Sequence, residues 1–188
     1  NAEVCVVGAG PAGMRAALSA AQHGVRVVLL EAQPWLGGCF DYRASEHSAG
    51  MPLFQRAKQL ATQVEQTGNI RIFRQTTLLG LYNDNLVTAC QKASEAESND
   101  GCYIEIRADS IVVATGCSER PRIFDNNERP GVMQASCAQR LARIYGLLPG
   151  RCAVFSIGHD MGLEAAVDLA DLGLTVACVA DCRSAGQD

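Results

Sequence analysis

Residues 4–13 read VCVVGAGPAG, and residues 27–31 read VVLLE after a helix-length stretch rich in small residues. An apolar strand, a Gly-x-Gly-x-x-Gly turn, a helix, a second apolar strand and a terminal carboxylate are together typical of a dinucleotide-binding βαβ unit. Gly8 permits the tight turn out of the strand, Gly10 lets the backbone approach a pyrophosphate, and Gly13 lets the helix lie close to the sheet. The pattern therefore predicts a dinucleotide site at this turn.

The residues beside the turn narrow the type of dinucleotide. The predicted helix begins near Pro11 and Ala12, so its free N–H groups and positive dipole end face the expected phosphates. Glu31 ends the second strand, where a carboxylate can accept hydrogen bonds from ribose hydroxyls. The same carboxylate would repel a 2′-phosphate, and Ala32 and Gln33 offer no arginine to bind one. These residues are compatible with NAD or FAD and disfavour NADP.

Composition limits the class of protein. The 188 residues suit one domain, or one domain and part of another, and the hydrophobic fraction of 48% can supply a core. A net charge of −4 gives no basic surface for nucleic acid. No apolar run approaches the roughly 18 residues of a membrane span, and no basic leader precedes the first strand, so we expect neither a membrane segment nor a signal peptide.

The nine cysteines are scattered, without the paired spacing of a zinc site. Cys5, Cys152 and Cys178 lie in strands that we predict to be buried, where a thiol behaves as a small hydrophobe. Cys39 stands where flavin disulfide reductases begin their redox-active segment, but residues 40–45 contain no second cysteine to close a disulfide. This argues against a dithiol reductase and predicts reduced thiols in a cytoplasmic protein.

The middle of the chain continues the α/β pattern. Hydrophobic spacing predicts a helix over residues 52–66 and a short parallel strand over residues 70–73. Three further strands, over residues 77–82, 86–90 and 103–107, are joined by polar turns. We interpret these three strands as an antiparallel meander that covers the sheet, although a generic surface meander has the same pattern.

A second marker lies at residues 110–116, which read SIVVATG. The apolar strand runs into Ala114, Thr115 and Gly116, whose small side chains let the backbone pass close beneath a bound dinucleotide. Its position, about a hundred residues after the glycine turn, is typical of flavoproteins that contain two dinucleotide-binding domains. The two markers support each other.

A degraded copy of the first unit follows. A strand and turn at residues 152–158, a helix at 161–172 and a strand ending at Asp181 repeat the plan of residues 4–31. In this copy, Asp160 stands near the place of the pyrophosphate, which is electrostatically unfavourable for a phosphate site. We therefore interpret the copy as a structural βαβ unit rather than a second nucleotide site. His159 is interpreted as a polar contact or helix cap rather than an acid–base catalyst.

These patterns predict an α/β fold, with a Rossmann-like parallel sheet, a three-stranded antiparallel meander and then a second, incomplete βαβ unit. We assign residues 1–122 to the first part of a dinucleotide-binding domain of the FAD/NAD(P) type. Residues 123–150 are expected to form a linker with a helix, and residues 151–188 to begin a second Rossmann-like unit.

Several longer motifs carry a specific family resemblance. Residues 114–121 read ATGCSERP, residues 128–133 read ERPGVM, and residues 143–150 read RIYGLLPG. With EAQP at residues 31–34 and two glycines at residues 37–38, the chain resembles the alpha subunits of heterotetrameric sarcosine oxidases. Related amine, opine and cyanide-forming dehydrogenase subunits share parts of these motifs. The resemblance covers nearly the whole chain but only a fragment of such a subunit, which is several times longer.

The resemblance implies an oxidoreductase subunit. Enzymes of this kind oxidatively demethylate sarcosine with molecular oxygen and pass a one-carbon unit to tetrahydrofolate. Their flavin chemistry is associated with the alpha–beta interface and the beta subunit, while the glycine-rich domain of the alpha subunit holds NAD as a tightly bound, largely structural cofactor. The resemblance thus implies NAD here, with FAD as the alternative, and partners that are other subunits of a hetero-oligomeric oxidase.

The candidate cofactor-binding residues come from both turns, the end of the second strand, the loop after it and the meander. They are Gly8, Gly10, Pro11, Ala12, Gly13, Glu31, Ala32, Gln33, Gly38, Leu78, Ala114, Thr115 and Gly116. We assign no catalytic residue and no metal ligand, because the sequence indicates neither a nucleophile–base pair nor a metal cluster, so any chemistry belongs to a cofactor.

Three further expectations concern the function of the isolated chain. Proteins with two dinucleotide domains usually complete the first domain with a segment that returns after the second. We therefore expect this fragment to hold nucleotide weakly, to be inactive alone and to self-associate through exposed sheet surface. The alternatives are a non-catalytic assembly scaffold with a vestigial nucleotide site, or a FAD-dependent dehydrogenase or reductase subunit of related type.

Overall fold

The computed structural model describes residues 1–43, 51–93 and 101–183. The chain forms two compact units, which are described separately: unit 1 is Asn1–Phe40 with Gln55–Gly116, and unit 2 is Asp41–Phe54 with Cys117–Asp188. In chain order the elements are β1 (Ala2–Val7), α1 (Pro11–Gln22), β2 (Val27–Leu30), η1 (Gly38–Asp41), α2 (Leu53–Gln66), β3 (Ile70–Phe73), β4 (Thr76–Tyr82), η2 (Asn83–Asn85), β5 (Leu86–Gln91), β6 (Cys102–Val113), α3 (Ala135–Tyr145), β7 (Cys152–Ile157), α4 (Asp160–Asp171) and β8 (Thr175–Asp181).

Unit 1 is built on a six-stranded sheet in the order β3-β2-β1-β6-β5-β4. Strand β1 lies between two parallel neighbours, because Val4 is in register with Val27 of β2 on one side and with Ser110 of β6 on the other. The strands β4, β5 and β6 pair antiparallel and form the expected meander. The predicted α/β class, with its parallel sheet, its meander and a following βαβ unit, is confirmed.

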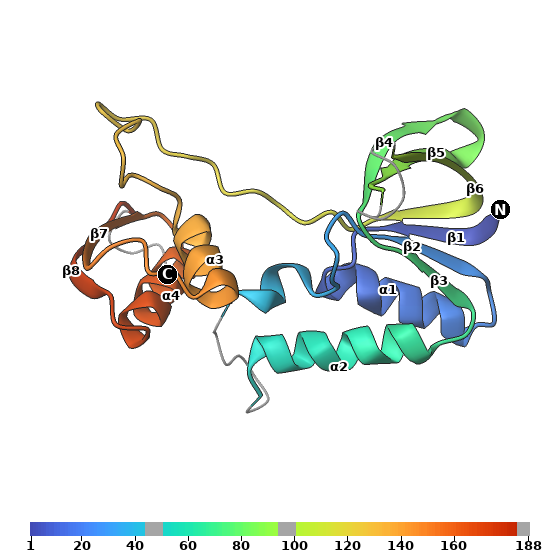
Figure 1. Ribbon diagram of the computed structural model, residues 1–188, viewed down its shortest axis with the longest axis horizontal. Coiled ribbons are helices and arrows are strands. Elements are labelled where there is room, and N and C mark those ends of the chain that lie inside the picture. Colours follow the sequence, from blue (N-terminus) through green and yellow to red (C-terminus); the bar gives the residue numbers. More distant parts are fainter. Residues whose placement is uncertain (44–50, 94–100, 184–188) are drawn as a thin grey trace. The chain divides into compact units, whose positions relative to one another are not determined.

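Both faces of the parallel strands are covered, which explains the apolar runs at residues 4–7 of β1 and 27–30 of β2. Helices α1 and α2 lie along one face and the meander rises from the other (Figure 1). On the helix side, Val6 and Leu29 pack in one buried cluster with Met14 of α1 and Val64 of α2. The cluster on the meander side contains Ala2, Cys5, Val7, Leu30, Val87, Ala89, Ile106 and Ala108. The alternation of side chains along β1 and β2 therefore supplies two separate cores.

The structure corrects one prediction about the strands. Residues 103–107 and 110–113 were expected to form separate strands, but they belong to the single strand β6. Its first half, up to Arg107, pairs with β5, and its second half, from Ala108, pairs with β1. The pairing partner changes between Arg107 and Ala108, and the polar residue Asp109 that follows does not break the strand.

Unit 2 contains the parallel strands β7 and β8, joined through α4, together with helix α3. Phe155 and Ile157 of β7 pack against Ala166 and Leu169 of α4 and Ala138 of α3. The packing agrees with the expected βαβ repeat. The helix expected within residues 123–150 is α3, and it ends at Tyr145, since Gly146 adopts a left-handed conformation with φ of 68°.

Two polar contacts hold α3 in place. The Glu119 carboxylate accepts hydrogen bonds from the backbone N–H groups of Ser136 (2.9 Å) and Ala135 (3.3 Å), so it caps the start of α3. The buried Asp168 carboxylate of α4 accepts hydrogen bonds from the Gln139 amide (2.9 Å) and the Arg143 guanidinium of α3 (3.0 Å from Nε). Glu119 belongs to a motif that carries the family resemblance, and here its role is structural.

The cysteines of unit 2 also differ from the prediction. Cys5 is fully buried as expected, and burial raises the pKa of its thiol to about 11. Cys152 and Cys178 were expected to be buried too, but both are exposed. They lie with Val154, which is 68% exposed, on the face of β7 and β8 opposite Phe155. The prediction was wrong because the described residues cover only one face of these two strands.

Within the described ranges, no helix combines the length and the apolar character needed to cross a membrane.

The Asp168 cluster leads to a prediction about stability. Replacing Asp168 with alanine leaves the buried Gln139 amide without its acceptor and the Arg143 guanidinium without its counter-ion. We expect Asp168→Ala to destabilise unit 2 by about 3 kcal/mol. Native-state amide hydrogen exchange of α3 and α4 measures this locally. Asp171→Ala, at the exposed end of α4, is the matched control. We expect its stability to lie within about 0.5 kcal/mol of wild type. Equal protection in both variants would show that the cluster contributes nothing.

Candidate dinucleotide site

The candidate site lies at the carboxyl edge of the parallel strands in unit 1. The chain leaves β1 at Gly8, leaves β2 at Glu31 and leaves β6 at Ala114. Strand β1 connects through α1 to β2 on one side, while its other neighbour, β6, comes much later in the chain. In open α/β sheets, such a reversal of strand order leaves a crevice where ligands bind. The topology therefore places both sequence markers at one edge.

Glycine is required at the centre of this edge because backbone segments approach each other closely. A Cβ on Gly8, whose φ is 100°, would lie 2.4 Å from the Ala114 carbonyl oxygen and 3.2 Å from Thr115 Cα. A Cβ on Gly13 would lie only 1.8 Å from the Gly8 carbonyl oxygen and 3.3 Å from Ala114 Cβ. Gly8, Gly13 and the turn after β6 thus pack as one compact group.

Gly10 differs from these two glycines. Its φ of −71° suits any residue, and a Cβ there would meet only Gly38 Cα at 4.0 Å. Gly10 is also the N-cap of α1 and provides no side-chain hydrogen bond to the first turn of the helix. Among the described residues, internal packing therefore does not require glycine at position 10.

The loop after β2 is attached to the glycine turn. Gly38, with φ of 61°, lies against Gly10, since a Cβ on Gly38 would be 2.8 Å from Gly10 Cα. The Gly37 N–H donates a hydrogen bond of 3.0 Å to the Ala9 carbonyl oxygen. Candidate residues from the turn and from this loop therefore lie side by side.

The Glu31 carboxylate joins the same two segments. Its Oε2 accepts a hydrogen bond from the Ala9 N–H at 2.7 Å, and its Oε1 accepts one from the Gln33 N–H at 2.8 Å. The sequence predicted the position of Glu31 but not these amide donors. They fix the orientation of the carboxylate and leave each oxygen with further acceptor capacity for a ribose hydroxyl.

The other candidate residues occupy different surroundings. Pro11 and Ala12 form the first turn of α1, and Ala32 and Gln33 are exposed beyond β2. The exposed Thr115 and Gly116 follow β6. Leu78 lies in β4 and packs against the core cluster on the meander side, so the structure gives it a place in the core.

Comparisons with known proteins agree with this geometry. The pyridine nucleotide-disulphide oxidoreductase family matches residues 2–185. The chain belongs to this family. It is a dinucleotide-binding oxidoreductase domain, and the family binds FAD or NAD(P).

Two curated relatives and one solved structure are similar to nearly the whole of this chain. The chain is 35% identical over 186 residues to the alpha subunit of sarcosine oxidase from Corynebacterium sp. (strain P-1), covering 95% of this chain and 19% of that protein. It is 30% identical over 184 residues to an opine oxidase subunit of Rhizobium meliloti, and this match covers 95% of this chain and 35% of that protein. The L-proline dehydrogenase structure from P. horikoshii matches with a TM-score of 0.81 and 25% identity. This match covers 100% of this chain and 37% of that one. The resemblance predicted from the motifs is confirmed, for a chain that spans about a fifth of the sarcosine oxidase relative.

The family name includes a disulphide, but Cys39 is a free thiol here and no cysteine follows it before Cys90. Across the part of the chain that the structure describes, no group of three His, Cys, Asp or Glu side chains could hold a metal ion.

A polar group around Cys182 was missed by the sequence analysis. The exposed Cys182 sulfur lies 3.6 Å from the Ser156 hydroxyl and accepts a hydrogen bond of 2.9 Å from the Arg122 guanidinium. These two contacts, the Ser156 hydroxyl first and then the Arg122 guanidinium, lower the pKa of the Cys182 thiol. Arg122 lies 60 residues away in sequence, so spacing alone gave no signal of the contact.

The lowered pKa of Cys182 has a measurable consequence. Because the thiolate reacts with alkylating agents, we expect the rate of Cys182 labelling by iodoacetamide to rise at lower pH than that of a free thiol in solution. Peptide mass spectrometry after timed labelling between pH 6 and 10 resolves each site. Ser156→Ala with Arg122→Gln should move the Cys182 profile to higher pH. Identical profiles before and after substitution contradict the assignment.

The glycines generate a second prediction, which separates packing from binding. Gly13→Ala should destabilise unit 1 by about 1–3 kcal/mol, because its Cβ overlaps the Gly8 carbonyl. Gly10→Ala should leave stability within about 0.5 kcal/mol of wild type but weaken dinucleotide binding, because a methyl group holds the pyrophosphate away from the backbone. Thermal denaturation and titration calorimetry measure the two effects. A Gly10→Ala variant with unchanged affinity would remove Gly10 from the site.

Proposed function

We propose that this chain is the dinucleotide-binding portion of an amine-oxidising oxidoreductase subunit similar to sarcosine oxidase alpha. In this proposal the first βαβ unit, β1–α1–β2, holds NAD mainly as a bound structural element. The observation that carries the proposal is the joining of the glycine turn, the Glu31 carboxylate and the Ala114 turn at one carboxyl edge. A nicotinamide or flavin group, when bound, supplies hydride transfer, and this chain supplies binding and orientation.

The residues present fit a dinucleotide in two respects. The uncapped N-terminus of α1 offers backbone N–H groups and a positive dipole end to the pyrophosphate, and Gly10 leaves that approach open. The Glu31 carboxylate is held in place by the Ala9 and Gln33 amides, so it is preorganised to accept ribose hydroxyls. We assign Gly13, Ala114 and Thr115 to the close packing that shapes the site. Pro11, Ala12, Ala32, Gly38 and Gly116 are proposed as neighbouring contacts.

The finer parts of the proposal rest on the relatives. The matched sarcosine oxidase and opine oxidase chains are both named as subunits, which supports other subunits of a hetero-oligomeric oxidase as partners of this protein. Oxidative demethylation of sarcosine is the proposed activity of the whole assembly, with the isolated chain inactive. The division at residues 122 and 150 and the cytoplasmic location belong to the same proposal.

The experiment that tests the cofactor assignment is release and identification of the bound nucleotide. Because the chain is expected to hold nucleotide weakly, the purified 188-residue chain is dialysed to equilibrium against an equimolar mixture of NAD, NADP and FAD. After acid denaturation, we expect liquid chromatography to show mainly NAD in excess over the dialysate. Release of FAD from a yellow preparation supports the flavin alternative and contradicts the NAD assignment. Absence of any nucleotide, also in titrations, favours a scaffold with a vestigial site.

Glu31 provides the matched mutational test. Glu31→Gln weakens the acceptor of two amides and of the ribose hydroxyls, so we expect NAD affinity to fall about 10-fold or more, equivalent to about 1.4 kcal/mol. It also removes the charge that repels a 2′-phosphate, so the preference for NAD over NADP should narrow. Glu105→Gln, an exposed carboxylate on β6, is the control and should change neither affinity. An unaltered NAD/NADP ratio in Glu31→Gln contradicts the proposed role.

A further inference from the structure

We propose that the Asp160–Arg183–Asp181 ion pairs, with Arg122 beside the same turn, close the carboxyl edge of the second βαβ unit, β7–α4–β8, so that this unit holds no dinucleotide. The family binds pyridine nucleotides and flavins, and this unit repeats the plan of β1–α1–β2, so its residues must be tested for the same fit. The inference concerns unit 2 and does not depend on which nucleotide the first unit binds.

The two βαβ units share one local hydrogen bond, from a backbone N–H to the carboxylate at the end of the second strand. Glu31, after β2, accepts a hydrogen bond from the N–H of Gln33 at 2.8 Å, and Asp181, at the end of β8, accepts one from the N–H of Arg183 at 3.0 Å. In both units the carboxylate therefore binds the amide two residues later. The acidic position at the end of the second strand of the first unit is therefore preserved in the second unit.

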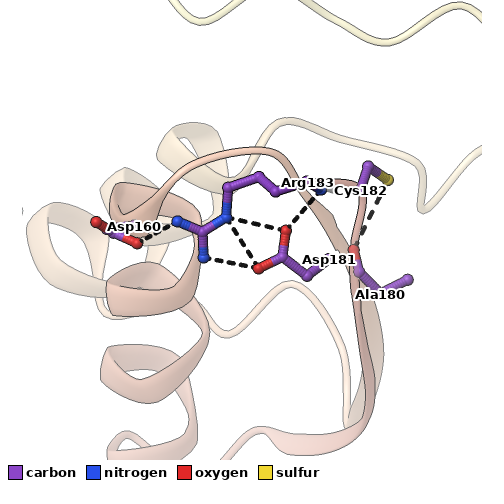
Figure 2. Close-up of polar contacts among 5 residues, drawn as sticks. All are labelled: Asp160, Ala180, Asp181, Cys182 and Arg183. Atoms are coloured by element: carbon purple, nitrogen blue, oxygen red, sulfur yellow. Dashed lines mark hydrogen bonds and ion pairs between the residues drawn. The ribbon is translucent and has the colours of Figure 1, made fainter. Parts of the chain in front are cut away.

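The second contact of each carboxylate differs. In unit 1, Glu31 reaches back to the amide of Ala9 in the glycine turn. In unit 2, the Arg183 guanidinium lies between two carboxylates (Figure 2). It donates to Asp181 Oδ2 at 2.7 Å and to Asp160 Oδ1 at 2.7 Å, so it links the end of β8 to the start of α4. Arg183 thus bridges the carboxylate after β8 and the start of α4, whereas in the first unit Glu31 contacts the backbone of the glycine turn directly.

The start of α4 is itself unsuitable for a pyrophosphate. Gly10 precedes α1, whereas Asp160 is the first residue of α4 and its side chain is 79% exposed. A carboxylate at a helix N-terminus is stabilised by the helix dipole and occupies the place that a phosphate would take. Asp181 adds a second negative charge, and Arg183 is already paired with both. An entering pyrophosphate would therefore have to displace two ion pairs and meet two carboxylates.

Arg122 covers the turn from another direction. Its Nη2 lies 3.0 Å from the position that a Cβ on Gly158 would take, and its Nη1 donates to the Cys182 sulfur at 2.9 Å and to the Ser156 hydroxyl at 3.4 Å. Gly158 is the residue that corresponds to Gly8, where the neighbour is the backbone of Ala114. A long side chain therefore lies against the second turn where a backbone segment lies against the first.

Amide chemical shifts of the isotope-labelled 188-residue chain test the inference directly. During titration with NADH, we expect the signals of Ala9, Gly10 and Gln33 to shift and those of His159 and Arg183 to stay within error. Saturable shifts at His159 and Arg183 would overturn the closure. If the signals of Ala9, Gly10 and Gln33 also stay unchanged, the proposed function fails while this inference stands. The two failures are therefore distinguishable.

A set of variants tests the charge mechanism, with inorganic pyrophosphate as the probe. Asp160→Asn with Asp181→Asn removes both carboxylate partners of the Arg183 guanidinium, so we expect pyrophosphate to bind at His159 and Arg183 at least 10-fold more tightly than in wild type. Arg183→Ala keeps both carboxylates and should gain no binding. Asp171→Asn changes the same charge at the far end of α4 and is the control. No gain in the double variant, or an equal gain in the control, contradicts the mechanism.

Discussion

The close approach of backbone segments around Gly8 is the constraint on which unit 1 depends. The carbonyl oxygen of Gly8 occupies the space where a Gly13 side chain would begin, and the carbonyl of Ala114 occupies the space beside Gly8. Helix α1 can therefore lie against the sheet at its N-terminal end only if both positions lack a side chain. This single contact sets the direction of the helix dipole relative to the carboxyl ends of β1 and β6.

Local pattern predicted those features that depend on local geometry. The glycine spacing, the apolar strands and the terminal Glu31 follow from one short βαβ unit, and each lies where the pattern indicates. The amide partners of Glu31 were not predictable, because they depend on the path of two loops that meet only in the folded chain. The residues of the candidate site were thus recognisable from the sequence, whereas the orientation of its carboxylate was not.

The features that were missed depend on what packs against each element. Cys5 and Cys178 both lie in apolar strands, yet the first is fully buried and the second is exposed. The difference is whether a second layer covers the strand, and strand sequence does not carry that information. Strand β6 is a similar case. Residues 103–107 and 110–113 belong to one strand, and only its pairing partner changes along its length.

The continuity of β6 links parts of unit 1 that are otherwise independent. One half of this strand is held in register by β5 and the other half by β1, and the strand leads directly to Ala114. A single residue inserted within it would advance the chain by about 3.3 Å and reverse the facing of every later side chain. The length of the strand between the meander and Ala114 therefore acts as a fixed spacer for the glycine turn. Variation in loop length can be absorbed at the tip between β4 and β5, but not along β6.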